Sequence, residues 1–145
     1  MTKLFLDTSV VIYSLDPRDR TKQEKALAWL SLAASRGCLT ISPQVCAETR
    51  SVAVRKLGLK HDVARAAIER LLPWCIAPMT ATEVQLALDL ADSRKMSWWD
   101  ALMISSALGA GCTHFLTEDV QSAPEVDGMQ IVDPFTTALE AVLKG

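Results

Sequence analysis

The residues of this sequence that could do chemistry are its carboxylates. Asp7 follows the apolar run LFL, and Glu118 and Asp119 follow the run HFLT. Each run has the length and composition of a buried β-strand. Because ligands of an open parallel sheet bind beyond the carboxyl ends of its strands, we expect these acids at one edge of the sheet.

Two further acids are placed to join that edge. Glu48 lies three residues after Val45 and four before Val52, on the apolar stripe of its own predicted helix. Asp100 lies in the first turn of another predicted helix, beside two tryptophans. A buried carboxylate requires a partner. Acids that converge on one edge repel each other unless a cation lies between them, and hard oxygen ligands favour Mg²⁺ or Mn²⁺.

Each acid also has a purely structural interpretation. Asp7 could simply cap a turn, and Asp100 could be the acid of a capping box. Glu48 could pair with a neighbouring arginine such as Arg50, and Asp119 could be a surface turn residue. These alternatives stay open, but the sequence contains no competing site. Its two histidines lack ligand spacing, and it has neither a Gly-rich phosphate loop nor a GxSxG motif.

Apolar strands alternate with helices of ten or more residues along most of the chain. The strands are predicted at 3–7, 38–42, 74–77, 113–119 and 129–135, with a turn at Thr8 and Ser9. The helices are predicted at 21–34, 43–57, 61–72, 84–95, 101–110 and 136–144. This alternation predicts an α/β fold, with a central parallel sheet and helices on both faces, in one domain spanning residues 1–145.

Composition excludes several classes of protein. A chain of 145 residues that is 50% hydrophobic and 22% charged is typical of one globular domain rather than a disordered protein. The four cysteines are widely separated and form no CxxC pair, which predicts reduced thiols rather than a disulfide or a zinc site. No window reaches the roughly 18 apolar residues of a membrane span. We therefore expect a cytoplasmic protein with no membrane contact.

Basic residues concentrate between positions 49 and 70, where six Lys or Arg residues stand against two acids. Residues 96–145, in contrast, hold one basic residue and seven acids. A cation-loaded acidic site beside a basic helical surface suits a phosphodiester, whose backbone the basic residues would follow. An ordinary solvated helix face would have the same composition.

Four segments together resemble the PIN-domain ribonucleases, and more narrowly the VapC-type toxins of bacterial toxin–antitoxin pairs. They are LFLDTSVVIY, the lone Glu48, WWDALMISSAL, and FLTEDVQ followed by IVDPF. The resemblance covers nearly the whole chain and implies a single PIN domain, a compact α/β sandwich around a parallel sheet. It also implies Mg²⁺- or Mn²⁺-dependent cleavage of single-stranded RNA and an antitoxin that masks the site.

The resemblance assigns roles residue by residue. The acids that it makes catalytic and metal-binding are Asp7, Glu48, Asp100 and Asp119. It places Ser9 and Thr117 at hydroxyl positions that orient ligands or water, and its LTxD pattern selects Asp119 over Glu118. The sequence departs from the family pattern at Asp133, where Asn is frequent, and in its bulky pair of tryptophans.

The expected mechanism follows from this ligand set. Asp7 and Asp100 would bind the first ion directly, and Glu48 and Asp119 would complete its shell through water or hold a second ion. A metal-activated water would attack the phosphate in line and leave a 5′-phosphate and a 3′-hydroxyl. The residues predicted to contact RNA are Arg50, Arg55, Lys56 and Lys60.

The expected partners are the RNA substrate, a cognate antitoxin and a second copy of the chain. An apolar Val-, Leu- and Ala-rich set of helices suits both a homodimer and a groove for an antitoxin segment. Two alternatives remain: a PIN nuclease of RNA processing that has no antitoxin, and a noncatalytic PIN module that binds RNA or a protein.

Overall fold

A five-stranded sheet forms the centre of the structure, a computed structural model that describes residues 1–119 and 124–143. The spatial order is β2-β1-β3-β5-β4. The strands are β1 (Leu4–Leu6), β2 (Leu39–Thr40), β3 (His114–Leu116), β4 (Glu125–Val126) and β5 (Met129–Val132). The first three and β5 are parallel, whereas β4 pairs antiparallel with β5.

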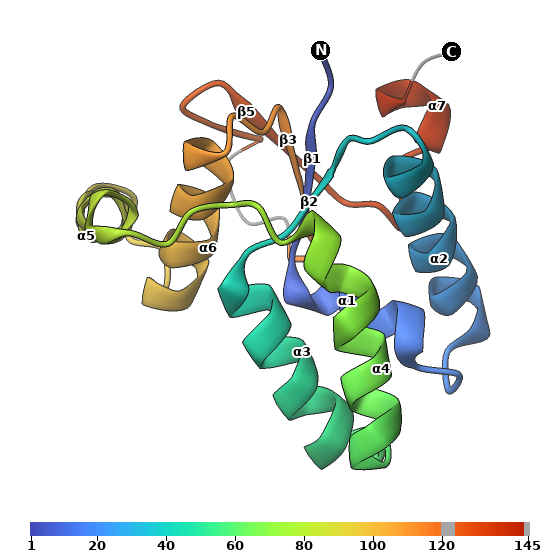
Figure 1. Cartoon of the computed structure of the whole chain (residues 1–145). Coiled ribbons are helices and arrows are strands. Elements are labelled where there is room, and N and C mark those ends of the chain that lie inside the picture. The colour runs from blue at the N-terminus through green and yellow to red at the C-terminus, as the bar shows by residue number, and fades with distance from the viewer. Residues whose placement is uncertain (120–123, 144–145) are drawn as a thin grey trace.

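Helices cover both faces of this sheet, as predicted. Figure 1 shows α5 and α6 on one side and α2 with α7 on the other, while α3 and α4 extend side by side from the edge at which β1 ends. The helices are α1 (Thr8–Leu15), α2 (Arg20–Ser35), α3 (Pro43–Arg55), α4 (His61–Leu71), α5 (Ala81–Arg94), α6 (Trp98–Gly109) and α7 (Leu139–Val142), with a short 3₁₀ helix η1 (Leu72–Trp74).

The buried position of strand β1 explains why its sequence is uniformly apolar. Leu4, Phe5 and Leu6 have no exposed surface, because helices cover the sheet above and below them. The ring of Phe5 stacks on that of Phe115 in the neighbouring strand, with centroids 5.2 Å apart. In the helix layer that contains α2, the indole N–H of buried Trp29 donates to the Pro134 carbonyl at 2.8 Å. This hydrogen bond connects α2 to the segment after β5. A rigid core therefore lies directly behind the end of β1.

Capping side chains set three helix starts where the sequence signals them. The Ser42 hydroxyl accepts from the Val45 N–H before α3, and the Ser97 hydroxyl accepts from the Asp100 N–H before α6. The capping box of Thr80 and Glu83 is formed at α5. Each cap satisfies backbone donors that the helix itself leaves open. These starts place Glu48 and Asp100 in the early turns of their helices.

The structure corrects the first predicted turn. Residues 8–15 form α1, and its N-cap is Asp7, whose carboxylate accepts from the Val10 N–H, rather than Thr8 or Ser9. The β-branched composition of this segment lowers helix propensity. Burial of Val10 and Val11 against the core overrides that preference.

One further element prediction is wrong, and one short strand was not predicted. Residues 74–77 form no strand: η1 covers Trp74, and a single parallel bridge joins Cys75 to Ile41. At the other sheet edge, the sequence gives no signal for the two-residue strand β4, so the sheet is mixed rather than purely parallel. The last helix is shorter than predicted, spanning Leu139–Val142, and Lys144 lies outside the described residues.

All four cysteines are free of disulfide bonds, as the sequence predicts. Cys38, Cys46 and Cys112 are buried, and burial raises the pKa of Cys112 to about 11. Cys46 has its pKa raised to about 12 by burial and by the neighbouring Cys75 thiol. None of the helices in the described part of the chain has the length and apolarity needed to span a membrane.

Close packing of α5 on α6 gives a test of the fold. A Cβ at Gly109 would lie 2.9 Å from Pro78 Cγ and 3.1 Å from Glu83 Oε2. We therefore expect Gly109→Ala to lower the free energy of unfolding by about 1–3 kcal/mol, the usual cost of overpacking. Chemical denaturation measures this, and adding Pro78→Ala should recover part of the loss. A Gly109→Ala variant as stable as the wild type would contradict this packing.

Candidate active site

The four predicted acids line one cavity of about 460 Å³ at the carboxyl ends of β1 and β3. They arrive from separate elements: Asp7 from the end of β1, Asp119 from the segment after β3, Glu48 from α3 and Asp100 from α6. Glu118 lines the same cavity, together with Thr8, Ser9 and Met103. The fold thus brings together residues that are more than a hundred positions apart in the sequence.

Asp7 is the most constrained of these acids. Its Oδ1 accepts from the Ser9 hydroxyl at 2.5 Å and from the Val10 N–H at 3.3 Å, and its carboxylate also hydrogen-bonds the Thr117 side chain. Burial raises the pKa of Asp7 above its usual value, and these hydrogen bonds only partly offset that effect. Asp7 is therefore both the cap of α1 and a carboxylate aimed at the cavity, so its two interpretations are compatible.

Thr117 connects two of the acids. Besides its bond to Asp7, its hydroxyl oxygen accepts from the Asp119 N–H at 3.1 Å. Thr117 is buried, whereas the Asp119 side chain is exposed. The Thr117 hydroxyl therefore holds both the backbone that presents Asp119 and the side chain of Asp7.

Glu48 is held by neutral side chains. Its Oε1 accepts from the Thr8 hydroxyl at 2.6 Å, and its Oε2 accepts from the Gln44 amide at 3.1 Å. The same Gln44 amide donates to the Trp99 carbonyl at 3.1 Å, which joins α3 to the first turn of α6. Over the described ranges Glu48 forms no ion pair with an arginine, so the structural alternative for Glu48 is wrong.

A cation and a phenol engage Glu118. Tyr13 donates its hydroxyl to Glu118 Oε1 at 3.0 Å, and the Lys22 ammonium pairs with Oε2. This ion pair raises the pKa of Lys22 to about 12. Lys22 also lies 4.8 Å from the centre of the Tyr13 ring. Of the two adjacent acids after β3, Glu118 is thus the one turned toward α1 and α2.

The donor set fits a hard divalent cation. Five carboxylates line the cavity, and the side chain of Asp100 is exposed to solvent. No three His, Cys, Asp or Glu side chains among the described residues form a ready cluster around a single point. Mg²⁺ usually keeps several of its waters and uses only one or two carboxylates directly. An open, acid-lined cavity of this kind matches that preference better than a compact zinc site would.

Sequence reasoning missed three residues that orient the acids: Thr8, Gln44 and Lys22. Gln44 precedes Glu48 by four residues, and this spacing places the two side chains on one helix face, so a signal was present. Thr8 directly follows Asp7. Lys22 is 96 positions from Glu118, and nothing in the local sequence indicates that contact.

The predicted RNA-contacting residues lie outside the cavity. Arg50, Arg55 and Lys56 are exposed along α3 and its end, and exposed Lys60 immediately precedes α4. The Arg50 guanidinium lies 3.2 Å from His61 Nδ1. Because α3 and α4 point away from the sheet (Figure 1), these cations form a surface beyond Glu48 rather than part of the acidic site.

A comparison with models of protein families shows the family to which this chain belongs. The family model described as "PIN domain" matches residues 4–128. The chain belongs to the PIN domain family. No curated protein sequence gives a significant match.

Solved structures with this fold include three VapC or VapBC proteins. VapBC2 from Rickettsia felis, bound to a promoter DNA fragment, is 16% identical with a TM-score of 0.65, covering 90% of this chain and 98% of that one. VapC20 from Mycobacterium tuberculosis, a toxin that cleaves the sarcin–ricin loop, is 20% identical (TM-score 0.61, 81% and 92% covered). DNA-bound VapBC from Salmonella typhimurium is 19% identical (TM-score 0.63, 92% and 99% covered). At these identities the likeness establishes the fold.

The buried carboxylate of Asp7 predicts how stability depends on pH. Since the folded-state pKa lies above the unfolded value, the folded protein binds the proton first, and stability rises as pH falls through the folded pKa. The gain is complete below the unfolded value of about 3.9. Asp7→Asn should therefore be more stable than the wild type at neutral pH in EDTA, and the difference should vanish near pH 3.

The matched control for this prediction is Asp7→Ala. Asn caps a helix as well as Asp does, whereas Ala loses the cap at a cost of about 1 kcal/mol. Thermal unfolding of the three proteins from pH 3 to pH 8 measures both effects. An Asp7→Asn protein less stable than the wild type at neutral pH would show that the charge of Asp7 stabilises the fold.

Proposed function

We propose that this PIN-domain chain is a Mg²⁺- or Mn²⁺-dependent endoribonuclease that cleaves single-stranded RNA, and that it is the toxin of a toxin–antitoxin pair. The observation that carries the proposal is the convergence of Asp7, Glu48, Asp100 and Asp119 on one open cavity. The sarcin–ricin loop cleavage named for VapC20, which shares this fold, supports the choice of RNA.

Each acid has a proposed role in holding the ion. Asp7 and Asp100 would bind it directly, and Glu48 and Asp119 would hold it through water or bind a second ion. When bound, the ion lowers the pKa of a water molecule and offsets negative charge on the phosphate. The hydroxyls of Ser9 and Thr117 keep the Asp7 carboxylate in one orientation through the hydrogen bonds described above.

The neutral partners of Glu48 suit this role. Thr8 and Gln44 orient the carboxylate without adding positive charge, so its full negative charge remains for a cation. An arginine in the same place would have neutralised it. The Lys22 ammonium, in contrast, pairs with Glu118, which is not one of the four proposed ligands.

The proposed partners extend this function. The two VapBC structures that share the fold support a cognate antitoxin, whose basic side chain would enter the acidic cavity and silence it. A homodimer is supported by Val84 and Leu88, which lie one turn apart on α5 and are 37% and 47% exposed. We place the protein in the cytoplasm, where its RNA substrates are.

Cleavage of a mixed pool of single-stranded RNA is the first test. We expect the purified protein to cut with Mg²⁺ or Mn²⁺, to stop in EDTA, and to leave 5′-phosphate ends. Asp100→Asn and Asp119→Asn should each reduce the rate about a hundredfold or more, since each removes a charge aimed at the reacting phosphate. Gel electrophoresis of end-labelled RNA measures the rate.

Asp92→Asn is the matched control, because Asp92 is exposed on α5 and lines no part of the acidic cavity. It should cut at the wild-type rate. If the wild type binds RNA but does not cut it in the presence of any metal, the chain is a noncatalytic PIN module.

The basic surface beyond Glu48 makes a separate prediction. If Arg55 and Lys56 contact the RNA backbone, Arg55→Gln and Lys56→Gln should each weaken binding similarly for all sequences. Each should also lower the slope of log affinity against log salt by about 0.7, the value for one phosphate contact on a single strand. Fluorescence anisotropy measures both, and an unchanged slope would remove these residues from the RNA-binding surface.

A further inference from the structure

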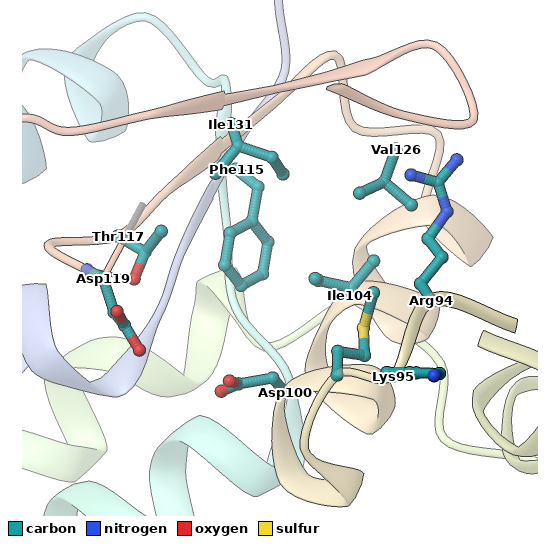
Figure 2. A pocket seen from close by; sticks show the side chains of 10 residues that line it. Arg94, Lys95, Asp100, Ile104, Phe115, Thr117, Asp119, Val126 and Ile131 are labelled. Carbon is teal, nitrogen blue, oxygen red and sulfur yellow. Dashed lines mark hydrogen bonds between the residues drawn. The ribbon is translucent and has the colours of Figure 1, made fainter. Parts of the chain in front are cut away.

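A second pocket lies beside the acidic cavity and shares two lining residues with it. It has a volume of about 480 Å³ and lies between α6 and the sheet strands β3 and β5. Asp100 and Asp119 line both spaces. Figure 2 shows these acids at one end, the apolar side chains of Phe115, Ile104 and Ile131 next to them, and Arg94 and Lys95 toward the far end.

We propose that this pocket holds the nucleotide next to the phosphodiester bond that is cut. Its base lies against the apolar wall, and its outer phosphate lies near Arg94 and Lys95. The proposal rests on the proposed function, because the acidic cavity must hold the scissile phosphate. It adds a binding site that is distinct from the basic surface of α3.

The order of chemistry along the pocket matches a strand of RNA. In an RNA strand each nucleotide has a phosphate on either side of its sugar, and its base projects from that sugar with two apolar faces. The pocket presents acids that could hold a cation, then apolar side chains, then two cationic side chains. Its volume falls within the range of about 300–1,000 Å³ that is usual for small-ligand sites. A basic protein segment would fit less well, since its charges would face Arg94 and Lys95.

The backbone conformation of Lys95 is a second, independent indication that this end of the pocket binds a ligand. Lys95 ends α5 in the left-handed conformation, with φ of 53°. This position normally favours Gly or Asn, because a longer side chain is strained there. Across residues 1–119 and 124–143, no hydrogen bond or ion pair engages the exposed Lys95 side chain. Strain of this kind persists where the side chain has a function.

Arg94 is only loosely engaged at the same end. Its guanidinium lies 3.4 Å from the Glu125 carbonyl and 3.7 Å from Asp127 Oδ1, and the Arg94 side chain is 37% exposed. These long contacts orient the group toward the β4–β5 hairpin without neutralising it fully. A phosphate could therefore replace water at Arg94 at little cost.

Two variants and one control test this pocket. Lys95→Asn removes the positive charge, and Asn tolerates the left-handed backbone conformation. Ile131→Trp fills the apolar part of the pocket with a larger side chain. Arg36→Gln makes the same charge change at the far end of α2, outside both pockets. Anisotropy with fluorescein-labelled single-stranded RNA octamers, in Ca²⁺ to prevent cleavage, measures binding. Calorimetry with Mn²⁺ measures the acidic site alone, and thermal unfolding confirms folding.

The expected result separates this proposal from the proposed function. Ile131→Trp should weaken RNA binding about tenfold, in line with the loss of one base contact. Lys95→Asn should lower the salt slope by about 0.7. Both should bind Mn²⁺ like the wild type, and Arg36→Gln should match the wild type in RNA affinity, salt slope and Mn²⁺ binding.

Three results would overturn the assignment. If the wild type cleaves RNA and both pocket variants bind it normally, the pocket takes no nucleotide, and a protein side chain becomes its occupant. If Ile131→Trp does not fold and Lys95→Asn keeps the wild-type affinity and salt slope, the assignment fails in the same way. If the wild type binds no RNA although it binds Mn²⁺, the proposed function and the nucleotide pocket fail together.

Discussion

Burial of an ionisable carboxylate in a cavity lined by other acids is the constraint on which the site depends. The fold places acids around one cavity and half-buries Asp7 at the end of a fully apolar strand, which raises the pKa of that carboxyl. Such an arrangement costs stability unless something holds each charge in place. Here the helix N-terminus of α1, the hydroxyls of Thr8, Ser9 and Thr117 and the amide of Gln44 do so. Most of these groups are neutral, so the cluster keeps its charge.

The same reasoning explains what the sequence could and could not predict. Strand ends and helix caps are local patterns, and they located Asp7, Asp119 and Asp100 at the sheet edge. The turn predicted at Thr8 and Ser9 is the start of helix α1, because buried valines outweigh local propensity. The pair of Lys22 and Glu118 depends on tertiary packing alone, so no window of sequence could show it. The two-residue strand β4 is too short to carry a period, and it lacks the short apolar run that surrounds β2.

Two kinds of cationic surface surround the acids, and they differ physically. The residues along α3 and before α4 are exposed and far from the core, so salt screens them strongly. Arg94 and Lys95 lie at the far end of a pocket with apolar walls, which lower the local dielectric, so that a charge there interacts more strongly with a bound group and salt screens it less. A substrate that used both would be attracted by the first and positioned by the second.

Gln44 makes the site sensitive to the spacing of two helices. One amide group spans from Glu48 on α3 to the Trp99 carbonyl at the start of α6, with both contacts at 3.1 Å. Hydrogen bonds weaken steeply once such distances lengthen. A small sliding of α6 along the sheet would therefore break the bond to Trp99 first and leave the Gln44 amide, one of the two groups that orient Glu48, less firmly placed. Substitutions that alter helix packing far from the site would then reduce the proposed nuclease activity while the protein remained folded. A partner bound to α6 would change the position of the Gln44 amide without touching the acids.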